Sequence, residues 1–579
     1  MKTNKYIGIT MLAATMLTAA SCTDFDDYNE VPSSDPSNGA SLTLWENISQ
    51  KPELSNFMEL IKRTGFEQKL MEPRSFTIWA PVNSNLNLDD YKNLSDSLLL
   101  AQVINNHIAE FNYVASGDVN TNVFVRNKKR YQFVGNGTYT FGDVKVLDTN
   151  IPGTNGTLHL LDSVLPFRPS IYEYLRLGTG FDKIRDYIIN CETRTLDISK
   201  SEKGPMVNGV QTYVDSVITV SNYMLDKNHI KASLSNEDSS YVFVAPTDEA
   251  YTDMYDKIKK IYKYATKTVS DDITKYDSKS ADSTVSITIN NTELLADSIT
   301  KQYIAYNLFF SNNDTYNKGI LDKKFALDTL RATTKTKLSN PQELLTDHLV
   351  GEPKLMSNGY VYMVDSLAYR PEEVYNPELE IFPVSATMKC FDHDENTIQV
   401  TDSSMTILGP DYLNFKYKII QPSGGEESKK LPTVFIKLPG VRATKYKFYC
   451  VFLPLSVGGS VNQNPSPFNY KLHYCKADGT QATYAFSAKY NRTGKSTDRN
   501  PSKLDLNNTS FMNDPEKTDT MYLGEFEFPI CYSGLSTKSS EFCPMLEITS
   551  PINVLLKTQL QNNSRDLRIW SFILKPQDE

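Results

Sequence analysis

Apolar and polar residues follow a helical spacing in much of the first two thirds of the chain and a strand-like alternation in the last third. The stretch LSNFMELIKRTGFEQKL, residues 54–70, places apolar residues three and four positions apart, which predicts a helix with one apolar face. The run 75–80 alternates into a strand that Pro81 ends, and the polar residues after it are suited to begin the next helix. Mixed helix and strand is therefore expected up to about residue 372.

One phrase of this pattern occurs twice. TIWAPVNSNL at 77–86 and VFVAPTDEAY at 242–251 each predict a strand ended by Ala-Pro and a helix after it, with Thr247 as a natural N-cap in the second. Both copies close with an Asn-Gly turn signal before another strand, at Asn155 and at Asn358. The closing aspartate stands seven residues after the asparagine in both copies.

This order of motifs resembles the fasciclin domain, which has a strand ending in an F-A-P-T-x-E-A-F type phrase, a mid-domain Tyr-His pair and a closing N-G-x-x-H-x-x-D phrase. The first copy carries the closing phrase in full, with His159 at the histidine position, whereas the second has Tyr362 there. Each copy keeps half of the Tyr-His pair, as Asn106-His107 and Tyr306-Asn307. The resemblance implies two fasciclin-like α+β domains in tandem, at 41–169 and 170–372.

The second copy is longer than the first. Most of the excess falls between Tyr255 and Thr300, and a further insertion lies near 197–236. The first of these insertions holds the lysine-rich stretch KIKKIYKYATK. Two interpretations stay open: a basic contact surface for an acidic partner, or the solvated face of an amphipathic helix with Ile258 and Ile261 turned inward.

Residues 378–579 predict an antiparallel β-sandwich or jelly roll, because short alternating runs recur between clusters of turn residues. The closing run LRIWSFILKP resembles the last strand of carbohydrate-binding sandwiches. Exposed aromatic rings on such a sheet stack on sugar rings, and rings on the alternate face are buried in the core. The candidate ligand-binding residues are Tyr470, Tyr474, Tyr484, Tyr490 and Trp570.

The N-terminus carries two lysines, an apolar run at 7–20 and small residues that lead into Cys22. The run is too short to span a bilayer comfortably, and the pattern resembles a bacterial lipoprotein signal, with residues 1–21 removed and Cys22 lipidated. The alternative is an ordinary signal peptide with an incidental cysteine. Residues 22–40 predict a flexible tether.

The acidic cluster TDFDDYNE follows Cys22 directly. It resembles the export tag that sends Bacteroidetes lipoproteins to the outer face of the outer membrane, and the alternative is a solvated acidic linker. We therefore expect a protein anchored by lipid in the outer membrane and exposed on the cell surface.

Charge and motifs exclude several classes of function. The 579-residue chain has a formal net charge of −9, which argues against nucleic-acid binding. It has no HExxH, GxSxG or Walker motif, and no cofactor or metal site is expected; FDHDEN at 391–396 favours a polar turn over calcium binding. We expect no enzyme, although a carboxylate pair meeting in a cleft would leave no signature in the sequence.

Two functional hypotheses follow. The first is a binding protein that captures a glycan or peptide for a SusC/SusD-type importer, with its site expected in 378–579. The second is a fasciclin-type adhesin that attaches cells to a matrix or to other cells. Capture predicts a concave site with exposed aromatic residues, and adhesion predicts a flat contact surface.

Overall fold

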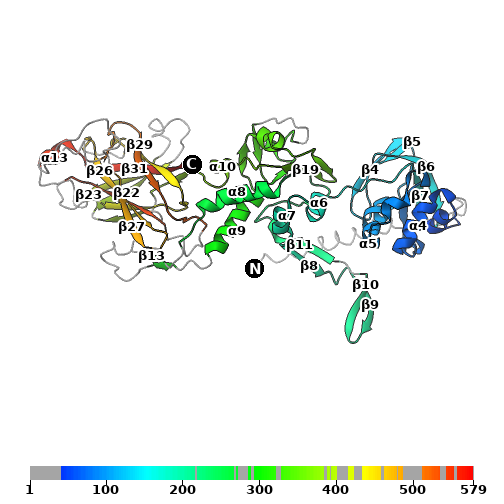
Figure 1. Cartoon of the computed structure of the whole chain (residues 1–579). Helices are drawn as coiled ribbons and strands as arrows, with labels where there is room; N and C mark the ends of the chain where they lie inside the picture. The colour runs from blue at the N-terminus through cyan, green and yellow to red at the C-terminus, as the bar shows by residue number, and fades with distance from the viewer. Residues whose placement is uncertain are drawn as a thin grey trace, which may run out of the picture. The chain divides into compact units, whose positions relative to one another are not determined.

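The computed structural model describes residues 41–215, 218–265, 269–271, 285–287, 292–320, 328–383, 388–391, 393–400, 415–422, 433–457, 462–478, 480–486, 511–534, 543–552 and 557–577. The chain divides into two compact units (Figure 1). The first comprises Met1–Leu177, Ser233–Tyr241 and Lys354–Tyr360, and the second comprises Gly178–Ala232, Val242–Pro353 and Val361–Glu579. The domain boundaries expected from the sequence stay a prediction.

The first unit is built on a seven-stranded sheet in the order β2-β1-β7-β6-β5-β4-β3. β1 and β7 run parallel, and the other neighbours run antiparallel. The strands are β1 (Phe76–Pro81), β2 (Ile108–Ala109), β3 (Asp118–Phe124), β4 (Arg130–Asn136), β5 (Thr138–Phe141), β6 (Val144–Gly153) and β7 (Gly156–Leu161). The helices of this unit include α3 (Leu44–Ser49), α4 (Ser55–Thr64), α5 (Asp96–Leu99) and α6 (Ile171–Leu177).

The two faces of this sheet bury separate cores, because successive side chains of a strand point to opposite sides. Ile78 and Ala80 of β1 belong to the cluster that includes α3 and α4. Trp79 between them belongs to a second cluster, where its ring stacks on Phe141 with 4.0 Å between centroids. The helix predicted at 54–70 is confirmed as α4 but ends earlier, at Thr64, and the strand predicted at 75–80 is confirmed as β1.

The Asn-Gly pair of the first copy joins three parts of this unit. The Asn155 side chain accepts a hydrogen bond from the Leu44 backbone N–H at 2.9 Å and donates one to the Leu70 carbonyl at 2.7 Å. Gly156 has φ +138°, and a Cβ on it would lie 1.9 Å from the Phe76 carbonyl oxygen. Only glycine lets β7 approach β1 this closely.

The same arrangement recurs at Asn358. Its side chain accepts a hydrogen bond from Ile171 N–H at 2.9 Å and donates one to the Leu234 carbonyl at 2.8 Å. Gly359 has φ +141°, and a Cβ there would lie 1.8 Å from the Tyr241 carbonyl oxygen. The repeated phrase therefore encodes one junction twice: the start of a helix, the loop before a strand, and that strand.

A buried lysine adds a second link within the first unit. Lys129 is 3% exposed, and its Nζ lies 2.5 Å from Glu173 Oε2, 2.7 Å from Glu237 Oε1 and 3.2 Å from Ser357 Oγ. Removal of one partner from a buried ion pair typically costs about 3–5 kcal/mol, because the remaining charge is left uncompensated. Lys129 therefore holds the turn before β4 against α6 and two other segments.

A four-stranded sheet has the order β15-β12-β19-β18. Its strands are β15 (Phe309–Ser311), β12 (Tyr241–Pro246), β19 (Gly359–Val364) and β18 (Lys354–Met356). The helices of the second unit include α7 (Asp182–Ile189), α8 (Asp248–Ile261), α9 (Thr292–Ala305) and α10 (Pro371–Val374). The predicted cap of α8 is confirmed, because Thr247 Oγ1 accepts a hydrogen bond from Ala250 N–H at 3.2 Å.

The insertion near 197–236 contributes two antiparallel strand pairs to the second unit. β8 (Glu192–Leu196) pairs with β11 (Ile218–Asn222), and β9 (Glu202–Val207) pairs with β10 (Val210–Asp215). These four strands form a projection that we call the arm. Figure 1 shows the pair β9-β10 at its end and the pair β8-β11 nearer to α7.

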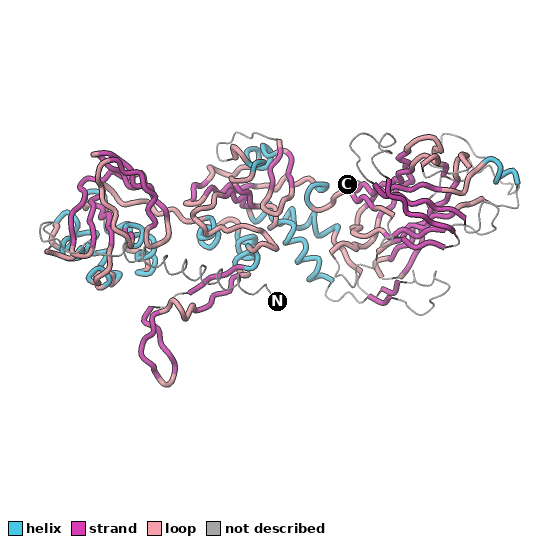
Figure 2. The backbone as a smooth tube through the Cα atoms, turned by 180° about the vertical axis from the view of Figure 1, so that it is seen from behind, coloured by secondary structure: helices cyan, strands magenta, loops and turns pink. Residues whose placement is uncertain are grey.

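The last part of the chain is rich in strands (Figure 2) and forms two antiparallel six-stranded sheets. The first contains β20 (Leu379–Ile381), β22 (His393–Val400), β23 (Phe415–Pro422), β25 (Lys445–Phe452), β29 (Asp519–Glu527) and β31 (Leu567–Pro576). The second contains β21 (Met388–Phe391), β24 (Thr433–Lys437), β26 (Pro467–Cys475), β27 (Gln481–Ala485), β28 (Phe511–Met512) and β30 (Met545–Thr549).

Residues of both sheets share one apolar cluster, which includes Phe448, Phe572, Leu472 and Leu546. The predicted closing strand LRIWSFILKP is confirmed as β31, which pairs with β20, β23 and β25. The polar turn predicted at 391–396 is wrong for the described positions, because Phe391 ends β21 and His393 begins β22. The jelly-roll topology stays a prediction.

We expect Gly156→Ala to lower the free energy of unfolding of the first unit by more than about 3 kcal/mol, because the new Cβ would overlap the β1 backbone. Gly117→Ala is the matched control, since Gly117 has φ +60° and no atom within 4 Å of an added Cβ. There we expect a loss of only about 1–2 kcal/mol. Denaturant unfolding measured by tryptophan fluorescence checks both, and equal losses would contradict the close-approach account.

Candidate functional site

The predicted aromatic platform is not a single surface. Tyr470 is 2% exposed and packs between Phe468 and Phe511 in the core of the two sheets, so the prediction of an exposed ring is wrong there. The reason is strand alternation: Phe468, Tyr470 and Leu472 all point to the buried face of β26. Tyr490 lies outside the described residues.

The other predicted rings lie at two separate places. Tyr474 and Tyr484 pack against Phe526, with centroid distances of 4.7 and 5.0 Å. These three rings, which we call the aromatic seam, lie where the edge strands β27 and β29 approach each other, and Tyr484 is 42% exposed. Trp570 is half-buried, and its ring centroid lies 6.5 Å from that of Phe382.

The Tyr-His position of the first copy is architectural. His107 is fully buried; its Nδ1 lies 2.7 Å from the Val103 carbonyl oxygen and its Nε2 accepts a hydrogen bond from Leu165 N–H at 2.9 Å. The ring is therefore neutral, with its proton on Nδ1. Burial lowers the pKa of His107 to about 4, because the charged form would lose hydration and face the Leu165 N–H. Burial also lowers the pKa of His159, whose Nε2 lies 2.9 Å from the Tyr113 carbonyl oxygen.

Asn307 takes the corresponding place in the second copy. Its Nδ2 donates to the Tyr303 carbonyl at 2.7 Å, four residues earlier, just as His107 contacts Val103. Its Oδ1 is buried without a hydrogen-bond partner in the described structure. Asparagine therefore replaces the donor function of the histidine but not its acceptor function.

A large cavity lined by described residues lies in the second unit. It has a volume of about 980 Å³, within the range of sites that bind small molecules. We call it the lysine pocket, after four residues at its lining: Lys257, Lys260, Lys263 and Lys445. Its lining comes from α8, from residues 366–376 and from the β-rich part after Glu378, so no single sequence segment contains it.

The charged residues that line the lysine pocket are mostly positive. All four lysines are exposed, and Glu527 is the one carboxylate among the described lining residues. Lys257 and Lys260 stand one helical turn apart on α8, and Lys263 follows the end of that helix. Lys259 lies elsewhere on the helix, where its Nζ is 3.2 Å from Glu293 Oε2. The amphipathic-helix interpretation is confirmed for α8, because Ile258 is buried whereas Lys257 and Lys260 are exposed; the basic contact surface stays a prediction.

The walls of the lysine pocket are fixed by buried hydrogen bonds. Arg442 Nε donates to Tyr262 Oη at 2.9 Å, and Tyr262 donates to the Tyr375 carbonyl at 3.1 Å. Ala443 N–H donates to the Ile261 carbonyl at 2.9 Å. Arg442 is buried, and its cation lies against the Tyr262 ring at 5.9 Å. These contacts join the end of α8 to the loop before β25.

One lining residue holds an amide oxygen without a partner. Asn376 is 3% exposed, and its Oδ1 has no hydrogen-bond partner in the described structure. A buried acceptor left unsatisfied costs about 1–3 kcal/mol; because this oxygen is itself buried, a molecule in the cavity does not reach it. No sequence pattern predicted a role for Asn376 or Arg442, whereas the spacing of the lysines on α8 could be read from the sequence.

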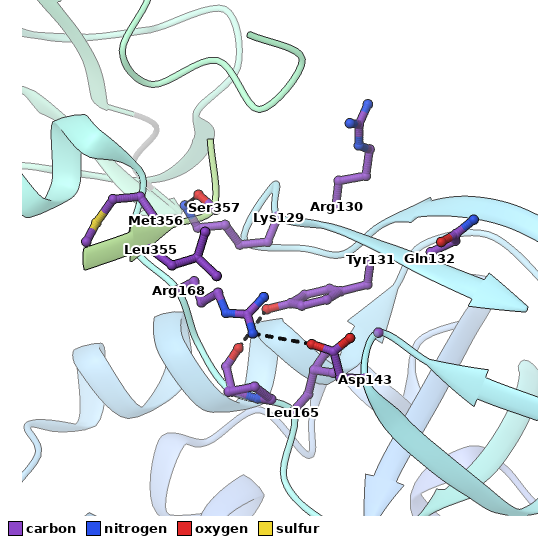
Figure 3. A pocket seen from close by; sticks show the side chains of 12 residues that line it. Lys129, Arg130, Tyr131, Gln132, Asp143, Leu165, Arg168, Leu355, Met356 and Ser357 are labelled. Carbon is purple, nitrogen blue, oxygen red and sulfur yellow. Dashed lines mark hydrogen bonds and ion pairs between the residues drawn. The ribbon is translucent and has the colours of Figure 1, made fainter. Parts of the chain in front are cut away.

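A smaller cavity of about 290 Å³ lies in the first unit (Figure 3). Its cations already have carboxylate partners: Arg130 Nη1 lies 2.9 Å from Asp238 Oδ1, and Arg168 Nη2 lies 3.3 Å from Asp143 Oδ2. The Tyr131 hydroxyl donates to the Pro166 carbonyl at 3.1 Å. The cations of this cavity are therefore less available to an incoming anion than those of the lysine pocket.

Among the described residues, no group of three or more His, Cys, Asp or Glu side chains could hold a metal ion. None of the helices in that part of the chain has the length and apolar character to cross a membrane.

Comparison with known proteins identifies the first copy. Residues 52–167 match the family model of the fasciclin domain, a stretch that runs from α4 through β7 and contains His107 and Asn155. The first copy therefore has the fasciclin fold, and the chain adds further β-rich regions to it. No curated protein matches the chain.

Among solved structures, a FAS1 domain pair from the insect cell adhesion molecule fasciclin I aligns at 14% identity over 56% of this chain and 98% of that chain, with a TM-score of 0.20. CBM22-1–GH10 modules of Clostridium thermocellum xylanase 10B, complexed with xylohexaose, align at 8% identity over 34% and 28%, also with a TM-score of 0.20. A Paenibacillus xanthan lyase aligns at 8% identity over 43% and 20%, with a TM-score of 0.17. Scores this low carry no argument about function.

The buried neutral His107 predicts acid sensitivity of the first copy. Between pH 6.5 and about 4 the unfolded chain binds a proton that folded His107 does not, so the free energy of unfolding falls as pH is lowered through this window. The loss from this residue is on the order of 3 kcal/mol. His107→Asn, which copies Asn307, should flatten this part of the profile. Denaturant unfolding at a series of pH values checks it, and an unchanged slope would contradict the assignment.

Proposed function

We propose that the protein is a non-catalytic, lipid-anchored surface protein that binds a glycan or peptide in the lysine pocket. The observation that carries this proposal is the pocket itself: about 980 Å³, with four exposed lysines in its lining and buried hydrogen bonds behind its walls. Concave sites of this size with a few convergent polar groups are the usual form of ligand sites.

The second copy is, in this proposal, a second fasciclin-like domain in tandem with the first. The recurrence of the Asn-Gly junction at Asn155 and Asn358 supports it, as does the matching contact of His107 and Asn307 with the carbonyl four residues earlier. The β-rich part after Glu378 acts as a sandwich-type domain that supplies one wall of the pocket. A role in binding rather than catalysis agrees with the fasciclin match in the first copy.

The location of the protein follows from its N-terminus. Cys22 carries the lipid, residues 22–40 form the tether, and the acidic cluster after Cys22 directs the protein to the outer face of the outer membrane. At this place a captured glycan or peptide would pass to a SusC/SusD-type importer. Neither a cofactor nor nucleic acid has a part in this function.

The alternative is a fasciclin-type adhesin. The arm of the second unit favours it, because Met206, Val207 and Val210 near its tip are all more than half exposed. Exposed apolar side chains grouped on a projecting hairpin are typical of protein–protein contacts. Capture and adhesion differ in the surface used: the lysine pocket in the first, the arm in the second.

Cys22→Ala should release the protein from the membrane fraction into the soluble periplasmic fraction, because the lipid that holds it is lost. Cys191→Ala is the matched control, since Cys191 is a buried free thiol of the second unit, and it should stay membrane-bound. Fractionation followed by immunoblotting checks both. Membrane association that survives Cys22→Ala would contradict lipid anchoring.

Filling the lysine pocket should abolish ligand capture. Glycan and peptide arrays probed with residues 22–579 should identify a ligand, and Ala477→Trp should weaken its binding at least about tenfold by placing a large ring in the cavity. Ala485→Trp is the control, because Ala485 is exposed on β27 and does not line the pocket. A ligand that binds Ala477→Trp as tightly as the wild type would place the site elsewhere. Binding lost only on truncation of the arm would favour adhesion.

A further inference from the structure

We propose that the lysine pocket is specific for an acidic carbohydrate, one that carries carboxylate groups together with free hydroxyls, such as a uronate oligosaccharide. This inference rests on the proposed function, because it names the ligand class of the same pocket. Two properties of the lining carry it: positive charge that the protein neutralises only in part, and apolar residues in the same lining.

The positive charge is only partly neutralised by the protein. Lys445 Nζ lies 2.5 Å from Glu525 Oε2, which leaves little of its charge for a ligand. Lys257 and Lys263 make no ion pair with a described residue. An anion that enters between them would replace water around two ammonium groups and reduce their mutual repulsion, so a carboxylate is favoured over a neutral group.

The remaining lining is apolar. Met254, Phe528, Pro371 and Pro529 contribute to it. The C–H faces of a sugar ring pack well against such surfaces. The volume of about 980 Å³ also exceeds what an inorganic anion would fill, and fits an oligosaccharide. An acidic peptide shares the charge but lacks the hydroxyl-rich ring, and it is the competing outcome of the test.

The test compares three probes by isothermal titration calorimetry on residues 22–579: trigalacturonate, its methyl ester and a triglutamate peptide. The ester keeps the sugar rings and removes the charges. We expect trigalacturonate to bind at least about tenfold more tightly than either of the others, with an affinity that falls as salt rises. The double variant Lys257→Gln/Lys263→Gln should lose at least about tenfold for trigalacturonate.

Lys259→Gln is the matched control, because it removes a lysine of the same helix that pairs with Glu293 and does not line the pocket; its affinity should stay at the wild-type value. If the methyl ester binds as tightly as the acid and Ala477→Trp abolishes both, the pocket is a ligand site and the acidic specificity is wrong. If triglutamate binds most tightly, the carbohydrate class is wrong. If trigalacturonate does not bind, the inference is overturned, and the array result with Ala477→Trp decides the proposed function separately.

Discussion

The constraint on which the rest of the structure depends is the contact between an asparagine side chain and three pieces of backbone. At Asn155 and again at Asn358, one amide side chain caps the start of a helix, holds the loop before a strand and leads into a glycine that touches that strand. A side chain on either glycine would overlap a backbone carbonyl. The asparagine and the glycine that follows it are therefore fixed in position by these contacts. The need for both residues at one junction explains why the Asn-Gly phrase is repeated at the second junction.

The second of these junctions leads physically to the lysine pocket. Gly359 fixes β19 against β12, and β12 ends at Pro246 and Thr247, where the Thr247 hydroxyl caps α8. The direction of α8 then decides where its lysines point. Tyr262 follows the helix, and its hydroxyl accepts a hydrogen bond from Arg442 Nε. This contact joins the helix to the β-rich part of the same unit. The position of each ammonium group thus follows from a chain of local contacts that begins at the strand junction.

The sequence was informative where one residue type alone satisfies a local requirement. The Ala-Pro strand ends, the Thr247 cap and the Asn-Gly pairs predicted elements that the structure contains. It was misleading about Tyr470, because alternation along β26 shows that a side chain faces one side of a strand but not which side is buried. It was silent about Asn376 and Arg442, whose roles arise from contacts between residues far apart in the chain. The lysines of α8 lie between these cases, because the sequence showed their spacing but did not predict the cavity that they line.

The most direct measurement of the central claim is the difference electron density in crystals of residues 22–579 soaked with the glycan or peptide selected on the array. The account predicts density inside the cavity lined by α8 and Phe528, with a ligand oxygen within hydrogen-bond distance of Lys257 or Lys263. Density over the aromatic seam at Tyr484, with the cavity filled only by water, would contradict it. That result would place the ligand site at the aromatic seam, on the exposed edge of the two sheets. The lysines of α8 would then be only the solvated face of that helix.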